Sequence, residues 1–530
     1  MDNNAPSEGR EHWSGQLGFV LAAAGSAIGL GNIWKFPYIT GENGGGAFVL
    51  IYIVCILLVG MPVMLCEIIL GRHTQKNPVG AFKMLAPKSS MTAHILGIMM
   101  FICGIALLCF ETYGWGFIFL FVAVMIFKYG WVMPGIMSVF SGFIILSYYS
   151  VVGGWTISYF FNAMAGSLAF QNAQEATAFF NTLKVSPWTC VFFHVIFMGL
   201  TCLIIYSGVR KGIERWSRIL MPALFIILIA LILRGITLPN ALDGVDFFLR
   251  PDFSKIKPRS VLTALGHAFF TLSLGMGAII TYGSYVSKRE NLFKASLSIV
   301  GLDTLAAIMA GLAIFPVAYA VKINPECGPG LVFQTLPLVF SQIPFGSFWC
   351  AVFFLLLFIA ALTSGMSLLE VVVSFAMDEL KWTRHFATFV CGGAITVLGA
   401  FSAVSISNWK NIEWLHSVLV DIFNTAQTNF FDFMDNLGAN WLLPLSGLFI
   451  ALFTGWIWGT KKAVDEMRIG SENFADVNFI SLLAGLKDDP GHNAKIHIIT
   501  LASLWGIFIR FIAPLAILVA FLQIAGWIKL

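Results

Sequence analysis

Charged residues are scarce in this sequence. Lys, Arg, Asp and Glu make up 11% of its 530 residues, against roughly 25% in an ordinary soluble protein. Hydrophobic residues make up 58%, and so few charges cannot give such a chain a water-soluble surface. The composition therefore excludes a soluble globule and predicts a polytopic membrane protein whose partner is the lipid bilayer.

The patterns of several other protein classes are also missing. The nine cysteines form no CxxC pair, so neither a disulfide framework nor a thiolate metal site is indicated. The nine histidines are scattered, without an HExxH motif, and we do not expect an enzyme. The net charge of +4 includes no basic stripe, which argues against nucleic acid as a partner. No signal-peptide pattern precedes Trp13, so the first apolar span is expected to remain.

Long apolar runs dominate the rest of the sequence. A helix needs about 20 apolar residues to cross a bilayer. Eleven runs meet this length, near 15–36, 45–70, 134–161, 188–206, 216–234, 259–285, 293–321, 348–377, 385–404, 433–459 and 497–526. Two shorter runs within 93–127 flank Glu111. They predict a hairpin that either spans the membrane twice or re-enters it.

The distribution of Lys and Arg predicts the orientation. With the N-terminus inside, nineteen of these residues fall on the inner side and ten on the outer side, while Lys128 and Arg510 stay unassigned. Cytoplasmic loops carry the excess of Lys and Arg in membrane proteins. We therefore expect a multi-pass protein of the inner (plasma) membrane with a cytoplasmic N-terminus.

Glycine clusters interrupt the first and the sixth span at their midpoints, in Gly25–Asn32 and Ser273–Gly277. Several glycines together let a helix unwind and free its backbone polar groups. The two interruptions occupy corresponding places in two halves, 15–234 and 259–459. This pattern is typical of transporters built from inverted repeats, with the binding site at the breaks. Each cluster could instead be a close-packing surface of small residues.

Five stretches carry a family resemblance: Arg10–Trp13, Gly25–Pro37, Glu42–Phe48, Ala268–Gly277 and Ala361–Ser364. They resemble signature stretches of the neurotransmitter:sodium symporter family, and the bacterial amino-acid transporters most of all. The resemblance implies an all-α, LeuT-type fold with a 5+5 inverted repeat and unwound helices 1 and 6. A hairpin at 93–127 would be inserted between helices 2 and 3, and 497–526 would add one C-terminal helix. The implied function is sodium-coupled import of a neutral, bulky hydrophobic L-amino acid by alternating access.

The resemblance also implies two sodium sites built from oxygen ligands. The first would use Ala27, Asn32, Thr271 and Asp303. The second would use Gly25, Ile28, Ala360, Thr363 and Ser364. An acid as deep in a span as Asp303 is a functional candidate by default, although an Asp can also reach out from a helix end. Thr363 and Ser364 could instead bond back to their own helix carbonyls.

The same resemblance places an amino-acid pocket between the breaks. Its residues would be Ala27, Gly29, Gly31, Ile145, Tyr149, Phe270, Thr271, Ser273, Met276, Ser364 and Leu368. Gly29 leaves room for a carboxylate, which the amides at the break favour, and the Tyr149 hydroxyl would donate to it. Because the lining is almost wholly apolar, we expect Leu, Met or an aromatic amino acid.

Gates are expected on both sides of the pocket. Lys35 and Asp435 match the outer gate positions, with Lys in place of the commoner Arg, so the bridge should be looser. Arg10 and Trp13 would close the inner side against Asp378 and Tyr285.

Chloride is predicted not to be required. Chloride-dependent relatives use a Tyr, a Gln and two hydroxyls, which are matched here by Tyr52, His267, Thr271 and Ala307. The Gln and one hydroxyl are therefore missing, and Asp303 supplies a fixed negative charge instead. A membrane sensor that binds an amino acid without moving it remains an alternative function, and the oligomeric state stays open.

Overall fold

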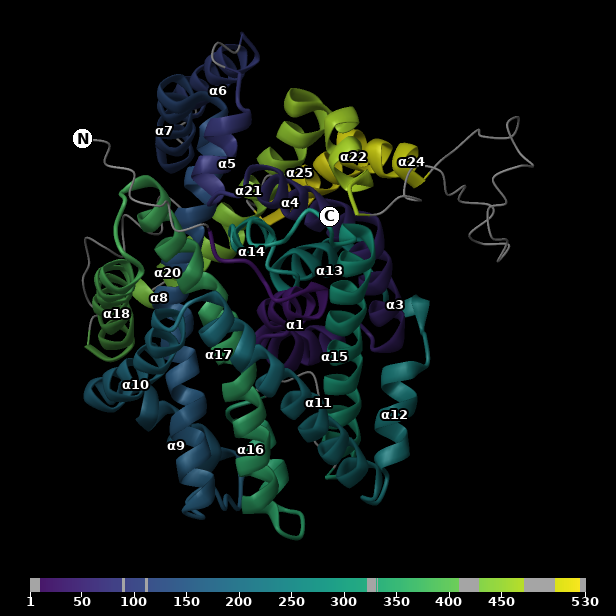
Figure 1. The fold of residues 1–530 in the computed structure, drawn as a ribbon. Coiled ribbons are helices and arrows are strands. Elements are labelled where there is room, and N and C mark those ends of the chain that lie inside the picture. Colours follow the sequence, from purple (N-terminus) through teal and green to yellow (C-terminus); the bar gives the residue numbers. More distant parts are fainter. Residues whose placement is uncertain are drawn as a thin grey trace.

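The computed structural model describes residues 10–87, 91–109, 113–321, 330, 332–408, 429–470 and 501–524. Every named element within these ranges is a helix, so the all-α prediction is confirmed (Figure 1). Nine helices in the described part are long and apolar enough to cross a membrane, and one bent pair would make a tenth. Of the eleven predicted spans, 259–285 alone misses this length, because it is broken into two short helices.

The first half of the chain contains α1 to α11. Their bounds are α1 (Gln16–Ala27), η1 (Gly31–Lys35), α2 (Phe36–Glu42), α3 (Gly46–Cys55), η2 (Ile56–Gly60), α4 (Met61–Thr74), α5 (Pro78–Leu85), α6 (Met91–Cys109), α7 (Tyr113–Tyr129), η3 (Gly130–Val132), α8 (Met133–Met164), α9 (Ala173–Val185), α10 (Pro187–Tyr206), η4 (Val209–Glu214) and α11 (Arg215–Ile236).

The second half continues from α12 to α25. Its elements are α12 (Ala241–Leu249), η5 (Phe253–Lys255), α13 (Pro258–Thr271), α14 (Ala278–Gly283), α15 (Leu292–Ala320), α16 (Thr335–Ser341), α17 (Gly346–Glu379), α18 (Arg384–Asn408), α20 (Phe430–Asp435), η7 (Asn436–Leu442), α21 (Leu443–Leu452), η8 (Phe453–Gly459), α22 (Thr460–Arg468), α24 (Leu501–Ile507), η9 (Phe508–Ile512) and α25 (Ala513–Ile524).

The first span is broken where the glycines predicted. Helix α1 ends at Ala27, and the next residue, Ile28, has an extended backbone with φ −78° and ψ 90°. The chain becomes helical again at η1 and continues into α2, and this second part is bent by 48° from α1. The last carbonyls of α1 and the first amides of η1 therefore lack the partners of a continuous helix.

The sixth span is broken in the same way. Helix α13 ends at Thr271 and α14 begins at Ala278. Between them Ser273, Gly275 and Gly277 have positive φ values of 55°, 79° and 76°. A Cβ at Gly275 would also lie 2.5 Å from the Leu443 carbonyl oxygen. Both the left-handed backbone and the close approach to α21 require glycine here.

Both breaks lie inside the bundle. In Figure 1 α1 occupies the centre, with α13, α14, α15 and α17 around it. Helix α1 contacts α15 and α17, and the two longest helices, α8 and α17, pack along each other. The unwound segments are therefore shielded from lipid, which is a requirement for irregular backbone at membrane depth.

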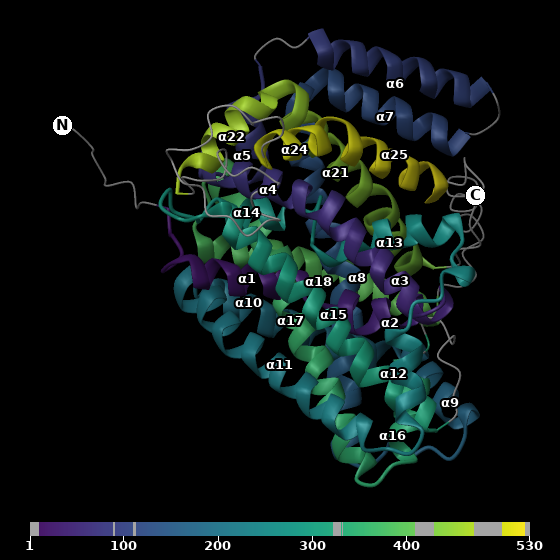
Figure 2. The ribbon, with the colours of Figure 1, turned by 90° about the vertical axis from the view of Figure 1, so that its right-hand side faces the viewer.

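Helices α6 and α7 cover most of the predicted hairpin at 93–127, of which residues 110–112 lie outside the described residues. Helices α6 and α7 run side by side at the edge of the molecule in both views (Figure 2). Gly97 and Gly104 permit this close packing, since a Cβ there would lie 2.9 Å from Phe127 and 2.8 Å from Leu120. The outward side of α6 is apolar and exposed, for example at Ile102, as expected for a surface that faces lipid.

Candidate binding site

A small buried cavity lies between the two helix breaks. Its volume is about 20 Å³, enough for a single water molecule. It is lined by Ser26, Ala27, Gly29, Leu30, Gly31, Ile145, Tyr149, Phe270, Thr271, Ser273, Met276, Ser364 and Leu368. The structure thus brings together all eleven residues of the predicted pocket and adds Ser26 and Leu30, whose positions within the first glycine cluster could have suggested them.

One wall of the cavity is apolar. Ile145 on α8, Met276 in the second break and Leu368 on α17 are each at most 4% exposed. Phe270, near the end of α13, completes this wall. No charged side chain lines the cavity among the described residues. The wall therefore suits an uncharged, apolar group.

The opposite wall is formed by the break in the first span. The Leu30 amide donates to the Tyr149 hydroxyl at 3.4 Å, and the Gly29 amide donates to Asn32 Oδ1 at 3.3 Å. A Cβ at Gly29 would lie 2.5 Å from Ser364 Oγ and 3.1 Å from the Tyr149 hydroxyl. Glycine at this position therefore permits the close approach of α8 and α17 to the break.

Serine hydroxyls lie beneath this wall. Ser273 Oγ donates to the Ser26 carbonyl at 2.8 Å, and Ser364 Oγ donates to the same carbonyl at 3.1 Å. Ser26 Oγ donates to Ser367 Oγ at 2.7 Å. Because these hydroxyl protons are used within the protein, the oxygens offer mainly lone pairs to a ligand, which is an acceptor surface suited to an ammonium group.

Asp303 lies fully buried beside the cavity, on α15. Its carboxylate accepts hydrogen bonds from Asn32 Nδ2 at 2.8 Å, Thr271 Oγ1 at 2.9 Å and the Tyr52 hydroxyl at 3.2 Å. These donors are neutral, so a small hard cation is a fitting partner for the buried charge. The alternative of an Asp that reaches out from a helix end does not fit this burial.

The residues of the first predicted sodium site thus converge from three spans. Asn32 belongs to η1, Thr271 ends α13, and Ala27 ends α1 and lines the cavity. Thr271 also lines the cavity. Tyr52, which we had matched to a chloride position, contributes a hydrogen bond to the carboxylate. The oxygens of this carboxylate, amide, hydroxyl and helix-end carbonyl are of the kind that hard cations prefer as ligands.

The second predicted sodium set lies where α1 meets α17. A Cβ at Gly25 would lie 3.3 Å from Thr363 Cβ, so the two helices are in direct contact there. Thr363 Oγ1 donates to the Ala360 carbonyl at 3.0 Å, which is the back-bonding alternative. A cation at this place would have to use lone pairs of the Thr363 hydroxyl and the Ala360 carbonyl, together with the oxygens of Ile28 and Ser364 nearby.

The predicted outer pair is not in contact. Lys35 and Asp435 are both described, and they form no ion pair; the Lys35 ammonium instead lies 4.8 Å from the centroid of the Phe270 ring. Asp435, at the end of α20, is exposed. The expected bridge is therefore absent in this structure, in which the Lys35 ammonium lies over an aromatic face.

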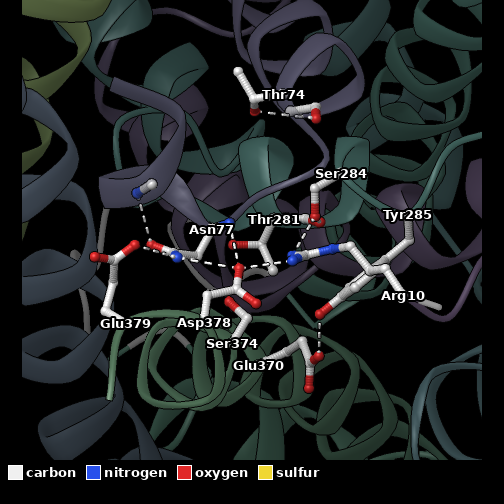
Figure 3. A network of polar contacts seen from close by, with 12 residues as sticks. Arg10, Thr74, Asn77, Thr281, Ser284, Tyr285, Glu370, Ser374, Asp378 and Glu379 are labelled. Atoms are coloured by element: carbon white, nitrogen blue, oxygen red, sulfur yellow. Dashed lines mark hydrogen bonds and ion pairs between the residues drawn. The ribbon is translucent and has the colours of Figure 1, made fainter. Parts of the chain in front are cut away.

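Three of the predicted inner residues, Arg10, Asp378 and Tyr285, meet in one network, shown in Figure 3. Arg10 donates to Asp378 at 2.6 Å and to Ser284 at 2.8 Å, and its guanidinium lies over the Tyr285 ring, 4.8 Å from the centroid. The Trp13 indole donates to the Tyr282 carbonyl at 2.9 Å. These contacts tie the segment before α1 to α17 and to the turn after α14.

Sequence reasoning missed three members of this network. The backbone amide of Asn77 donates to the Asp378 carboxylate at 2.8 Å. The Tyr285 hydroxyl donates to Glu370 at 2.6 Å, and Arg384 makes two hydrogen bonds to the same carboxylate, at 2.8 and 2.9 Å. Glu370 carried a signal that could have found it, since it is an acid inside the apolar run 348–377.

Neutralising Asp378 is expected to loosen the inner network. The Asp378→Asn variant loses a charge-assisted hydrogen bond, which corresponds to roughly a tenfold shift in an equilibrium. A cysteine introduced at Thr281, which is buried beside the network, should then react about ten times faster with a hydrophilic maleimide, as measured by mass spectrometry of its peptide. Lys83→Gln, which removes an exposed pair with Glu379, should leave the rate unchanged. Equal rates in both variants would mean that the Arg10–Asp378 pair does not hold this side closed.

The fold and the site define the class: a multi-pass helical membrane transporter with a candidate binding site at two helix breaks. A model of the sodium:neurotransmitter symporter family matches residues 10–132 and 189–480, and the chain belongs to this family. Its members are sodium-dependent transporters and not enzymes, as the sequence led us to expect.

Individual relatives agree with this assignment. The chain is 36% identical to the uncharacterized sodium-dependent transporter YhdH of Bacillus subtilis over 514 residues, which cover 97% of each chain. It is 34% identical to an uncharacterized sodium-dependent transporter of Haemophilus influenzae, over 97% of this chain and 98% of the relative. Among solved structures it is similar to MhsT in complex with L-phenylalanine, with 40% identity, a TM-score of 0.75, and coverage of 97% of this chain and 100% of MhsT. The LeuT-type fold is thereby confirmed.

Proposed function

We propose that this protein is a sodium-coupled symporter that imports a neutral, bulky hydrophobic L-amino acid by alternating access. One observation carries the proposal: Thr271 lines the buried cavity and also donates to the Asp303 carboxylate. The amino-acid pocket and the cation ligands are thus adjacent and share a residue. The L-phenylalanine bound to the similar transporter MhsT supports the choice of substrate class.

The walls of the cavity suggest how the amino acid lies. Its carboxylate faces the break in the first span, where the Leu30 amide and the Tyr149 hydroxyl can donate to it. Its ammonium group faces the acceptor surface around the Ser26 carbonyl. Its side chain lies against Ile145, Met276 and Phe270. Because the cavity has a volume of about 20 Å³, Met276 and other flexible side chains must rotate on binding, and a thioether adapts easily to different shapes.

Two sodium ions are part of the proposal. The first is held by Asp303, Asn32, Thr271 and the Ala27 carbonyl, and it is completed by the substrate carboxylate. The second is held by Gly25, Ile28, Ala360, Thr363 and Ser364. A cation that shares a carboxylate with the substrate binds more tightly when the substrate is present, so the two affinities are coupled.

Alternation requires polar closures that form in one state and break in the other. The Arg10–Asp378 network closes the cytoplasmic side in this structure, if the N-terminus is inside as the Lys and Arg distribution predicts. On the outer side, Lys35 would leave the Phe270 ring and approach Asp435 as that side closes. The two halves, 15–234 and 259–459, would then rock as inverted repeats around the breaks.

Chloride is expected to be unnecessary for transport. Asp303 already supplies a negative charge beside the first sodium site, and Ala307 on the same helix has no hydroxyl for an anion. Replacing chloride by gluconate on both sides should therefore change the initial rate of uptake by less than about twofold, because no counterion is lost. An uptake that collapses without chloride would show that the Asp303 charge is not the substitute.

Uptake by purified protein in liposomes tests the proposed function. With an inward sodium gradient, labelled L-phenylalanine should accumulate above its external concentration, and a potassium gradient should give no accumulation. A panel of twenty unlabelled amino acids as competitors would define the substrate. Sodium-dependent binding without accumulation would instead indicate the membrane sensor, and accumulation that ignores sodium would contradict the proposed coupling.

A further inference from the structure

A cationic groove lies between α22 and α24–η9, away from the amino-acid cavity. Its volume is about 360 Å³. It is lined by Thr460, Lys461, Val464, Asp465, Arg468, Ala502, Ser503, Gly506, Ile507, Arg510 and Phe511. Among the described residues, three cations therefore face one carboxylate, which gives this part of the groove a positive charge.

The groove lies on the same side of the molecule as the Arg10 network. Glu466 of α22 pairs with Lys288 at 2.7 Å and with Arg72 at 2.9 Å. Lys288 lies three residues after Tyr285, in the same turn as the inner contacts. Helix α22 is therefore fixed at the inner ends of α4 and α14, where apolar spans give way to charged segments.

Arg510 enters this groove from within a span. Helix α24 and the following η9 pack against the previous span at two levels. Gly506 of α24 lies next to Thr460, and Arg510 of η9 lies next to Gly455. Arg510 therefore lies about one helical turn deeper than the Thr460 level. Side chains on a helix point toward its N-terminus, which is the end nearer Thr460, and Arg510 lines the same groove as Lys461.

The charge of Arg510 has no carboxylate partner in the described part of the chain. Its guanidinium stacks on the Trp456 ring, 4.4 Å from the centroid, and its Nε is buried without a hydrogen-bond acceptor. The ion pair between Arg468 and Asp465 is long, at 3.8 Å, and both side chains are 55% exposed. An arginine at this depth is costly unless an anion meets it.

The surface beside the groove is apolar and faces outward. Ile507, Phe511 and Leu515 are 48%, 54% and 63% exposed, on a helix that spans the membrane. Cations at the inner boundary next to a lipid-facing apolar wall match an amphiphile with an anionic head and acyl chains. Basic pockets of this kind between transmembrane helices bind anionic lipid head groups.

We propose that this groove binds one anionic phospholipid, with its phosphate between Lys461, Arg468 and Arg510 and its acyl chains along Ile507 and Phe511. The lipid supplies the charge that Arg510 lacks and joins α22 to the C-terminal span. This site is independent of the proposed transport function, because none of its residues touches the amino-acid cavity.

Native mass spectrometry of the full chain, titrated with phosphatidylglycerol or phosphatidylcholine, tests the site. The wild type should hold one phosphatidylglycerol more tightly than phosphatidylcholine. Each lost cation should weaken this binding about fivefold, so Arg510→Gln should lose about fivefold and the Lys461→Gln/Arg510→Gln variant about 25-fold. Lys462→Gln, which removes the same charge from the same helix outside the groove, should match the wild type.

Three results would overturn the proposal. The first is equal binding of both lipids by the wild type, a result that does not depend on the folding of any variant. The second is a folded double variant with unchanged preference. The third is complete displacement of phosphatidylglycerol by an equal concentration of inorganic phosphate, which would identify a site for the free anion. Liposome uptake of L-phenylalanine by the same variants is measured separately, so a failure of the lipid site can be distinguished from a failure of the proposed transport function.

Discussion

Replacing Asp303 by Asn is expected to weaken sodium binding and amino-acid binding together. The carboxylate accepts from Asn32, Thr271 and Tyr52, so an amide in its place would turn one acceptor into a donor that faces other donors. The negative charge for the cation is lost as well. Losing a buried charged partner costs roughly 1–3 kcal/mol, which corresponds to about a 5- to 150-fold loss in each affinity.

Scintillation proximity binding of labelled L-phenylalanine at several sodium concentrations measures both affinities in one experiment. Asp246→Asn is a matched control, since Asp246 is an exposed acid on α12 whose contact with Arg250 is 3.7 Å. The control should behave as the wild type does. If Asp303→Asn lowered the amino-acid affinity without changing the sodium dependence, Asp303 would not be a sodium ligand.

A single methyl group at Gly29 is expected to weaken amino-acid binding strongly. The Cβ of Gly29→Ala would lie 2.5 Å from Ser364 Oγ and 3.1 Å from the Tyr149 hydroxyl, in the space proposed for the substrate carboxylate. Overpacking of this kind costs about 1–3 kcal/mol in a folded core. Here we expect most of this free energy to appear as weaker binding of the amino acid. We expect an affinity for L-phenylalanine about 100-fold weaker, measured in the same binding assay.

Gly199→Ala provides the control for this substitution. Gly199 lies on α10, and a Cβ there would meet nothing within 4 Å. Gly199→Ala should keep the thermal unfolding temperature of the wild type, while Gly29→Ala should lower it by a few degrees at most, because the Ser364 hydroxyl that its Cβ would meet can rotate away. Normal L-phenylalanine binding by a folded Gly29→Ala variant would place the carboxylate elsewhere.

The helix breaks could be predicted because their cause is local. Glycine in an apolar run is visible in the sequence, and the positive φ values of Gly275 and Gly277 are the reason for glycine there. The residues of the cavity followed from the family resemblance, which carries the arrangement of the spans. Periodicity alone could not have brought Ile145 and Leu368, on α8 and α17, to the same cavity.

The polar contacts between spans were harder to predict because they depend on side-chain geometry. Lys35 could pair with Asp435 or stack on Phe270, and the sequence does not distinguish the two. Glu370 and Arg384 are fourteen residues apart, and their pairing at 2.8 Å depends on how α18 folds back after α17. Arg510 could not be assigned to either side, because its role depends on the packing of η9 against Gly455.

The central claim is that the two broken spans hold sodium and an amino acid as mutual partners. Isothermal titration of the purified protein with sodium, with and without saturating L-phenylalanine, tests it most directly. We predict that the amino acid raises the sodium affinity, and that sodium raises the affinity for L-phenylalanine by the same factor, as linkage requires. A sodium affinity that is the same with and without the amino acid would contradict a shared site.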